Sequence, residues 1–349
     1  MLNNLSNFKL KSAKGLYLKG DKKLLDFSLG AGVHYFGHSN PNITAAICMQ
    51  RFKSNVTGCV SDIHEKVESQ LKELLPDEHH NFVFCSSGME ATTKAVRYAR
   101  AMTGKKAVVS IKGGWHGQND WTLELESGIP SINRWHISKG SDLKNLSWRQ
   151  IACVIYEPIR TSDPFLDLEF LSEIEHWCKK ENSLTICDEI VTGFRCTNRG
   201  LYSELGLSPD IVCYGKILGG GMPISLITMN NEVTNQTFKN KNKKVSSGGT
   251  FSANDLSLAA ASASLDIVKS TNYRKSMKRY RKLLRYANKK LKKAKIKGFG
   301  PVWRLSEQLK QEDMIKRGIF YASNGVIHLS PLTKKSHIKK FVKAVNELT

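Results

Sequence analysis

The regular alternation of short apolar runs with amphipathic stretches constrains the fold of this chain more than any other feature. Each run is rich in aliphatic residues and is short enough for one buried strand, and stretches of helical period separate several of the runs. Repeated strand–helix–strand units predict a parallel sheet with right-handed crossovers. The runs span residues 81–85, 106–111, 151–159, 184–188 and 211–213.

The composition fits a globular protein of more than one domain. A length of 349 residues is enough for a large domain and a smaller one. No apolar run approaches the length of a membrane span, and the first residues lack the pattern of a signal peptide. Eight cysteines occur without a C-x-x-C pair, so we expect reduced thiols in a cytoplasmic protein rather than disulfides or a zinc site.

The formal net charge of +22 is high, and part of it is concentrated in one segment. Thirteen Lys or Arg residues lie between Arg274 and Lys297. We favour a solvated face over a polyanion-binding face, and in the absence of a recognition motif we expect neither nucleic acid nor a membrane as a partner. Apolar residues at alternating spacings of three and four predict one amphipathic helix through this segment: Met277, Tyr280, Leu284, Ala287, Leu291 and Ala294.

Lys216 stands between a strand-like run and three consecutive glycines, Gly219–Gly221. Glycines at the end of a strand allow a ligand to approach the backbone closely. An amine that is removed from water there can lose its proton and react with a carbonyl to form a Schiff base. The alternative is an ordinary surface lysine in a loop.

Two adjacent carboxylates, Asp188 and Glu189, end the strand-like run that precedes Lys216. Ligands of parallel sheets gather at the carboxyl ends of the strands. A buried carboxylate there requires a cationic partner, and a protonated pyridine nitrogen is one such partner. The alternative is an aspartate that caps the following turn.

The turn Ser86–Gly88 connects a strand-like run to a helix that continues to Met102. Free backbone N–H groups and the helix dipole at such a turn favour a bound anion. Farther along, Trp115 and His116 follow another strand and lie among glycines, where a flat ring is able to stack on a planar heterocycle.

In this order and at this spacing, the motifs resemble those of fold-type I pyridoxal-phosphate enzymes. The closer resemblance is to class III aminotransferases, and within them to the glutamate-1-semialdehyde aminomutase branch. This resemblance implies a mostly parallel seven-stranded sheet with helices on both faces, plus a small α+β domain. It implies an N-terminal segment (1–55), a large cofactor-binding domain (56–255) and a shortened small domain (256–349). The segment 118–146 replaces a longer part of the family's active site.

The resemblance also implies a cofactor, pyridoxal 5′-phosphate, and roles for single residues. Lys216 and Asp188 are the catalytic candidates, and Thr250 is expected to reach the phosphate of the neighbouring subunit in a homodimer with shared active sites. Met89 replaces a hydroxyl residue of the family's phosphate cup. The cofactor-binding candidates are Ser87, Gly88, Met89, Trp115, His116, Glu157, Asp188, Ile190, Lys216 and Thr250.

Three functions follow from the resemblance and from the residues. The first is an aminotransferase that moves an amino group between a small amino compound and an aldehyde or keto acceptor. The second is an aminomutase that shifts the nitrogen within glutamate-1-semialdehyde. The third is a non-catalytic cofactor- or polyanion-binding protein. His34 and His38 are interpreted as structural histidines, so no metal site is expected.

Overall fold

A computed structural model describes residues 8–55, 58–121, 134–239 and 245–349 of the chain. It divides into two compact units. The smaller unit takes residues up to 45, then 161–165 and 272–349, and the larger unit takes 46–160 and 166–271. The domain boundaries expected near residues 55 and 255 stay predictions.

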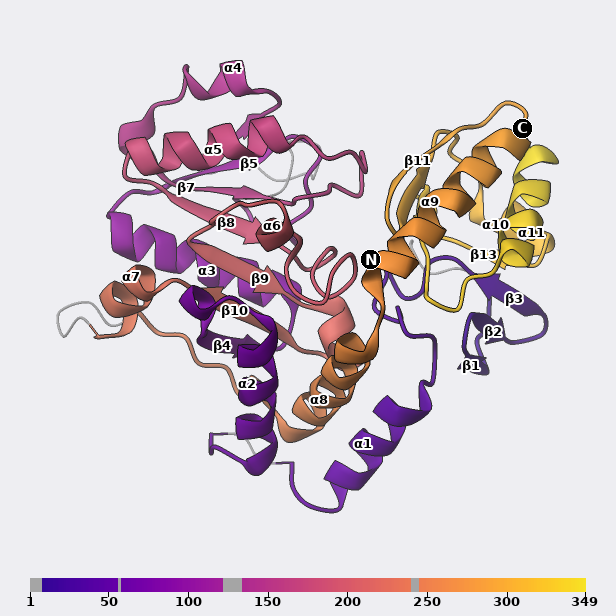
Figure 1. Cartoon of the computed structure of the whole chain (residues 1–349), viewed down its shortest axis with the longest axis horizontal. Helices are drawn as coiled ribbons and strands as arrows, with labels where there is room; N and C mark the ends of the chain where they lie inside the picture. Colours follow the sequence, from indigo (N-terminus) through magenta and orange to yellow (C-terminus); the bar gives the residue numbers. More distant parts are fainter. Residues whose placement is uncertain (1–7, 56–57, 122–133, 240–244) are drawn as a thin grey trace. The chain divides into compact units, whose positions relative to one another are not determined.

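The larger unit is built on a seven-stranded sheet, which confirms the expected fold class (Figure 1). The strand order is β4-β10-β9-β8-β7-β5-β6, and only β10 runs against its neighbours. Strand β6 was not anticipated from the sequence. The strands are β4 (Asn81–Cys85), β5 (Ala107–Ile111), β6 (Arg134–Ile137), β7 (Ile151–Tyr156), β8 (Leu184–Asp188), β9 (Ile211–Tyr214) and β10 (Ser225–Met229).

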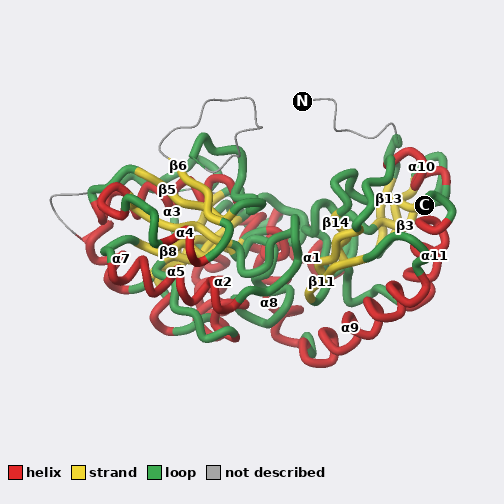
Figure 2. The backbone as a smooth tube through the Cα atoms, turned by 90° about the horizontal axis from the view of Figure 1, so that it is seen from above, coloured by secondary structure: helices red, strands yellow, loops and turns green. Residues whose placement is uncertain are grey.

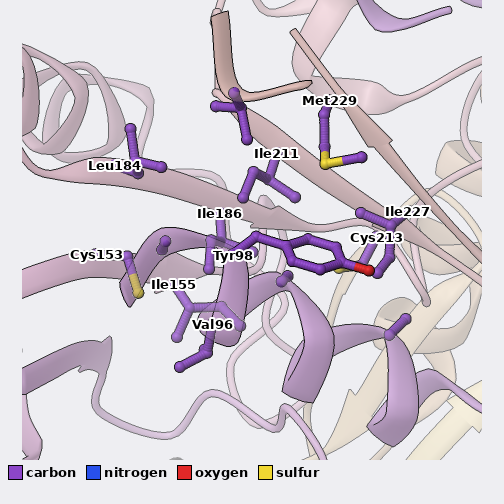
Figure 3. Packing of buried hydrophobic residues seen from close by; sticks show 14 of the residues in the cluster. Val96, Tyr98, Cys153, Ile155, Leu184, Ile186, Ile211, Cys213, Ile227 and Met229 are labelled. Carbon is purple, nitrogen blue, oxygen red and sulfur yellow. The ribbon is translucent and has the colours of Figure 1, made fainter. Parts of the chain in front are cut away.

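Both faces of this sheet are covered, because alternate residues of the central strands pack against different helices. On one face, Ile155, Ile186 and Cys213 join residues of α3 (Gly88–Thr103) in the main hydrophobic cluster (Figure 3). On the other face, the hydroxyl of Tyr156 donates to Glu175 of α5 (Leu168–Lys180). Continuous burial on both sides explains why the strands read as unbroken apolar runs.

The other helices of the larger unit are α1 (Pro41–Arg51), which begins in the smaller unit, and α2 (Asp62–Leu74), α4 (Gly140–Leu143), α6 (Leu201–Glu204), α7 (Asn231–Thr234) and α8 (Asp255–Ser270). The described residues also form short 3-10 and π turns: Asp77–His79, Trp148–Gln150, Lys216–Gly219 and Asn235–Lys239. Helices α2 and α8 pack against each other. No described helix is long and apolar enough to cross a membrane.

The smaller unit contains two further sheets, of order β1-β2-β3-β13 and β11-β12-β14 (Figure 2). Strands β2 and β3 pair antiparallel across Gly20 and form a hairpin. His38 Nε2 lies 2.7 Å from Asp26 Oδ2, an acidic neighbour that the sequence did not reveal. The elements are β1 (Ser12–Lys14), β2 (Tyr17–Lys19), β3 (Lys23–Asp26), α9 (Tyr273–Lys290), β11 (Ile296–Phe299), β12 (Val302–Leu305), α10 (Gln311–Lys316), β13 (Ile319–Phe320), β14 (Val326–His328) and α11 (Lys335–Asn346).

The predicted basic helix over Arg274–Lys297 is correct only in its first part, because α9 ends at Lys290. Leu291 and Ala294 are buried as expected, but they lie in the connection to β11. Asn288 fixes this connection, since its side chain bonds to both the N–H and the carbonyl of Ile296, at 2.8 Å each. A tertiary contact therefore overrides the helical period.

Candidate active site

The carboxyl ends of five strands of the seven-stranded sheet carry the residues that the sequence singled out. Strand β4 leads into the turn before α3, and β7 ends one residue before Glu157. Strand β8 ends at Asp188, and β9 ends two residues before Lys216. Trp115 and His116 follow β5. These strands run parallel, so their carboxyl ends share one edge of the sheet, the edge at which α/β proteins bind ligands.

Asp188 is buried, and its two carboxylate oxygens have different partners. Oδ2 lies 2.8 Å from His116 Nδ1, and Oδ1 accepts a 3.1 Å hydrogen bond from the backbone N–H of Ile190. The histidine thus supplies the cationic partner that a buried carboxylate requires. The geometry orients the carboxylate by two bonds from different directions.

His116 is itself enclosed, and its environment favours the protonated ring. Burial alone would lower the pKa of His116, but the hydrogen bond and charge of Asp188 raise it above its ordinary value. The hydroxyl of Thr92 on α3 donates to the carbonyl of His116 at 2.7 Å and fixes the backbone. His116 Nε2 is buried without a hydrogen-bond partner among the described residues.

Glu157 lies next to this pair. Its Oε2 accepts a 2.9 Å hydrogen bond from the backbone N–H of Trp115. Burial raises the pKa of Glu157 to about 7, while His116 opposes the shift. The carboxyl group therefore holds the Trp115 loop in place and titrates near neutrality.

Lys216 has a backbone conformation that ordinary residues seldom adopt, with φ at 45°. Such a conformation costs on the order of 1–3 kcal/mol and persists only where the surroundings impose it. Burial lowers the pKa of the Lys216 amine, and the Arg195 guanidinium lowers it further, while Asp188 and Glu157 act in the opposite direction. The amine of Lys216 is therefore easier to deprotonate than that of a lysine in water, and the deprotonated amine is the nucleophile.

The start of α3 has the strand–turn–helix geometry that is expected of an anion-binding turn. Ser87 caps the helix by accepting a 3.2 Å bond from the N–H of Glu90. A side chain at Gly88 would come within 2.7 Å of Ile190, so glycine allows Ile190 to pack against this turn. Met89, where the family has a hydroxyl, is exposed and packs beside Gly117.

Trp115 and Thr250 present exposed side chains. The Trp115 side chain is 56% exposed, so its ring is open to a ligand or to another chain. Thr250 lies in an exposed turn whose Ser252 hydroxyl donates to Glu90 of α3 at 3.3 Å. This contact places the turn beside the N-terminus of α3. The assignment of Thr250 to a neighbouring subunit stays a prediction.

Two supporting residues were missed in the sequence. Arg195 is fully buried and donates from Nε to the carbonyl of Val191 at 2.6 Å, within reach of the charge on Lys216. Ser225 of β10 donates to the carbonyl of Ser87 at 2.6 Å and anchors the anion-binding turn. The sequence did not mark Arg195, because it reads as one more cation in a basic chain. Part of the shortened segment 118–146, residues 122–133, lies outside the described residues.

The family model for aminotransferase class-III matches residues 3–128 and 133–328 of the chain. This match covers far more than half of the sequence and includes every residue of the site. The protein therefore belongs to the class-III aminotransferase family.

Curated relatives include glutamate-1-semialdehyde 2,1-aminomutases. The enzyme of Thermoplasma volcanium is 33% identical over 305 residues, covering 79% of this chain and 71% of its own. That of Sulfurisphaera tokodaii is 31% identical over 277 residues, covering 74% of this chain but only 65% of its own. A solved transaminase with PLP bound shares the fold at a TM-score of 0.85 and 20% identity, covering 99% of this chain and 92% of its own.

Glu189 provides a test of the buried carboxylates. Burial raises its pKa to about 7, although Thr192 donates to one oxygen and the Tyr202 N–H donates to the other at 2.7 Å. A carboxyl that prefers its proton in the folded state stabilises the fold at low pH, and this contribution is lost as the pH rises from about 4.5 to 7. We expect Glu189→Gln to remove this loss.

The measurement is the free energy of unfolding in urea at pH 5 and pH 8. A shift of this size corresponds to at most about 3 kcal/mol between the two pH values. The exposed Glu65→Gln serves as the control and should keep the wild-type pH dependence. An unchanged pH dependence in Glu189→Gln would show that Glu189 is ionised in the folded protein.

Proposed function

We propose that this protein is a pyridoxal-phosphate-dependent aminotransferase that moves an amino group between a small amino compound and an aldehyde or keto acceptor. The observation that carries the proposal is Lys216, whose amine has a lowered pKa and lies within the electrostatic reach of Asp188. A structural lysine does not require a lowered pKa beside a fixed carboxylate.

The residues present fit the cofactor. The N-terminus of α3, at Ser87, Gly88 and Met89, suits a phosphate. Asp188 suits a protonated ring nitrogen, because it is a carboxyl group at the strand end whose orientation is fixed by His116 and the N–H of Ile190. When bound, pyridoxal 5′-phosphate supplies a carbonyl that takes up the amino group and a ring that accepts electrons from the substrate carbon.

The chain's own groups then have separate tasks. Lys216 gives the cofactor its covalent attachment and, as a neutral amine, takes and returns the proton of the substrate carbon. Asp188 would pair with the ring nitrogen. Trp115 would offer its exposed ring for stacking, and Glu157 holds the loop of Trp115 by accepting from its backbone N–H. Ile190 packs between the α3 turn and the glycine before Lys216.

A second candidate is intramolecular transfer within glutamate-1-semialdehyde. The observation that favours it is the 31–33% identity to aminomutases. For either reaction we propose a cytoplasmic homodimer in which Thr250 reaches the phosphate site of the partner subunit. A protein that has lost catalysis is the third candidate, and the retained pair of Lys216 and Asp188 argues against it.

Dependence on an amino donor separates the two reactions. We expect the purified protein to consume glutamate-1-semialdehyde only when a donor such as L-alanine is present, and to form pyruvate in an equal amount. Chromatography of both products measures this stoichiometry. Formation of 5-aminolevulinate without any donor would instead establish the aminomutase.

Lys216→Ala should remove the yellow absorbance of the covalently bound cofactor, because the Lys216 amine is the only attachment point that we assign. Turnover should fall to background. Borohydride treatment of the wild-type holoprotein should fix the cofactor to the peptide that carries Lys216, as peptide mass spectrometry will show. The exposed Lys179→Ala is the matched control and should behave as wild type. Label on another lysine would refute the assignment.

Met89→Thr should tighten cofactor binding, because it restores a hydroxyl to the phosphate cup. A hydrogen bond to a charged group contributes about 1.5–3 kcal/mol. Fluorescence titration of the apoprotein with pyridoxal 5′-phosphate gives the dissociation constant. Met89→Leu, which adds no hydroxyl, should leave it unchanged. Equal affinity in all three proteins would mean that the phosphate does not bind beside residue 89.

A further inference from the structure

The excess positive charge of the protein is confined to the smaller unit. That unit contains 28 Lys and Arg against 7 Asp and Glu, which gives +21. The larger unit contains 25 against 24, which gives +1. A general excess of lysine would be shared between the two units, so this distribution requires a local explanation.

Within the smaller unit, the charge is concentrated on two helices that pack side by side, α9 and α11 (Figures 1 and 2). Lys335 Nζ of α11 lies 4.7 Å from the centre of the Tyr286 ring of α9, and Asn346 donates to the carbonyl of Lys290. Neither helix contains an acidic residue. We call their exposed cations the basic surface: Arg274, Lys275, Lys278, Arg281, Lys282, Arg285, Lys289, Lys290, Lys335, Lys339, Lys340 and Lys343.

This surface is unfavourable for the helix that carries most of it. Arg281 and Arg285 are four residues apart, as are Lys278 and Lys282, and each like-charged pair destabilises a helix by a few tenths of a kcal/mol. Arg274 and Lys275 in the first turn also oppose the helix dipole. An ordinary solvated helix alternates acidic and basic residues instead. An anion bound along α9 would remove this repulsion.

We propose that the basic surface binds the phosphodiester backbone of a nucleic acid without reading its sequence. The eight exposed cations of α9 extend over about 24 Å of the helix axis, from Arg274 to Lys290, so their average axial separation is about 3.4 Å. Phosphates along one strand of duplex DNA have about this axial spacing. Lys335 of α11 lies over one face of the Tyr286 ring of α9, so that face is not available to stack on a base.

The surface suits a membrane less well. A helix that lies on a bilayer inserts its apolar side into the lipid. The apolar side of α9 is formed by Tyr280, Leu283 and Ala287, and all three are buried within the protein. From the sequence alone we favoured a solvated face. The confinement of the charge to one unit and the absence of acidic residues on both helices now favour binding.

The test uses the full-length protein and a fluorescein-labelled 30-base-pair DNA duplex of mixed sequence. Fluorescence anisotropy gives the binding constant between 50 and 200 mM NaCl. Contact with six or more phosphates predicts that affinity falls by about a thousandfold or more over this range. A duplex of shuffled sequence should bind equally well.

Two variants with equal net charge separate the surface from the overall charge. The first changes Lys278, Arg281, Lys282, Arg285, Lys339 and Lys343 to Gln. The second changes six exposed cations of the larger unit to Gln: Arg51, Lys66, Lys72, Arg97, Lys144 and Lys179. Each lost phosphate contact reduces the slope of log affinity against log salt by about 0.9, so we expect the first variant to lose up to about 5 in slope and the second to match wild type.

Thermal unfolding should show the first variant to be at least as stable as wild type, because it removes like-charge repulsion. A third variant changes only Lys339 and Lys343 to Gln. Its slope of log affinity against log salt should fall by up to about 2. The proposal is overturned if both six-residue variants lose affinity equally, or if wild type binds the duplex without salt dependence. It is also overturned if vesicles with 30% phosphatidylserine bind more tightly than the duplex at the same salt.

Discussion

The buried contact between Asp188 and His116 is the interaction on which the candidate active site depends. A carboxyl group at the end of a central strand is removed from water on both sides, so it requires hydrogen-bonding or charged partners in the protein. His116 supplies one such partner at 2.8 Å, and Thr92 of α3 fixes its backbone. The pair therefore links the loop after β5 and the end of β8 to α3, the helix that begins at the turn Ser86–Gly88.

The sequence predicted this architecture because strands that are buried on both faces consist of unbroken apolar runs. Runs such as Ile151–Tyr156 contain only residues that tolerate complete enclosure, and their ends are marked by abrupt changes to Glu, Asp or Gly. Polar groups at the ends of several parallel strands must meet at one edge of the sheet. The sequence therefore predicted that Asp188 and Lys216 lie at this edge, and the family resemblance added Glu157.

The parts that the sequence did not predict depend on contacts between distant residues. The end of α9 is set by Asn288 and Ile296, which no helical period reveals. The sequence of β6, Arg134–Ile137, has no strong strand pattern, and the strand is recognised only by its parallel pairing with β5. Arg195 reads as one more cation among many, although it is fully buried. Its influence on Lys216 arises only when the turn after β8 folds back toward β9.

The near-neutral larger unit leaves the charge state of Lys216 to local groups. The larger unit has a net charge of +1, and salt screens surface charges beyond about 10 Å. The ionisable groups close to Lys216 therefore influence its pKa more than the distant surface charges do. Burial and Arg195 favour the neutral amine, while Asp188 and Glu157 favour the ammonium. Glu157 is the variable member of this set, since its pKa of about 7 allows it to gain a proton near neutral pH. Protonation of Glu157 removes one of the two negative charges that stabilise the ammonium, so the same change makes the amine of Lys216 easier to deprotonate.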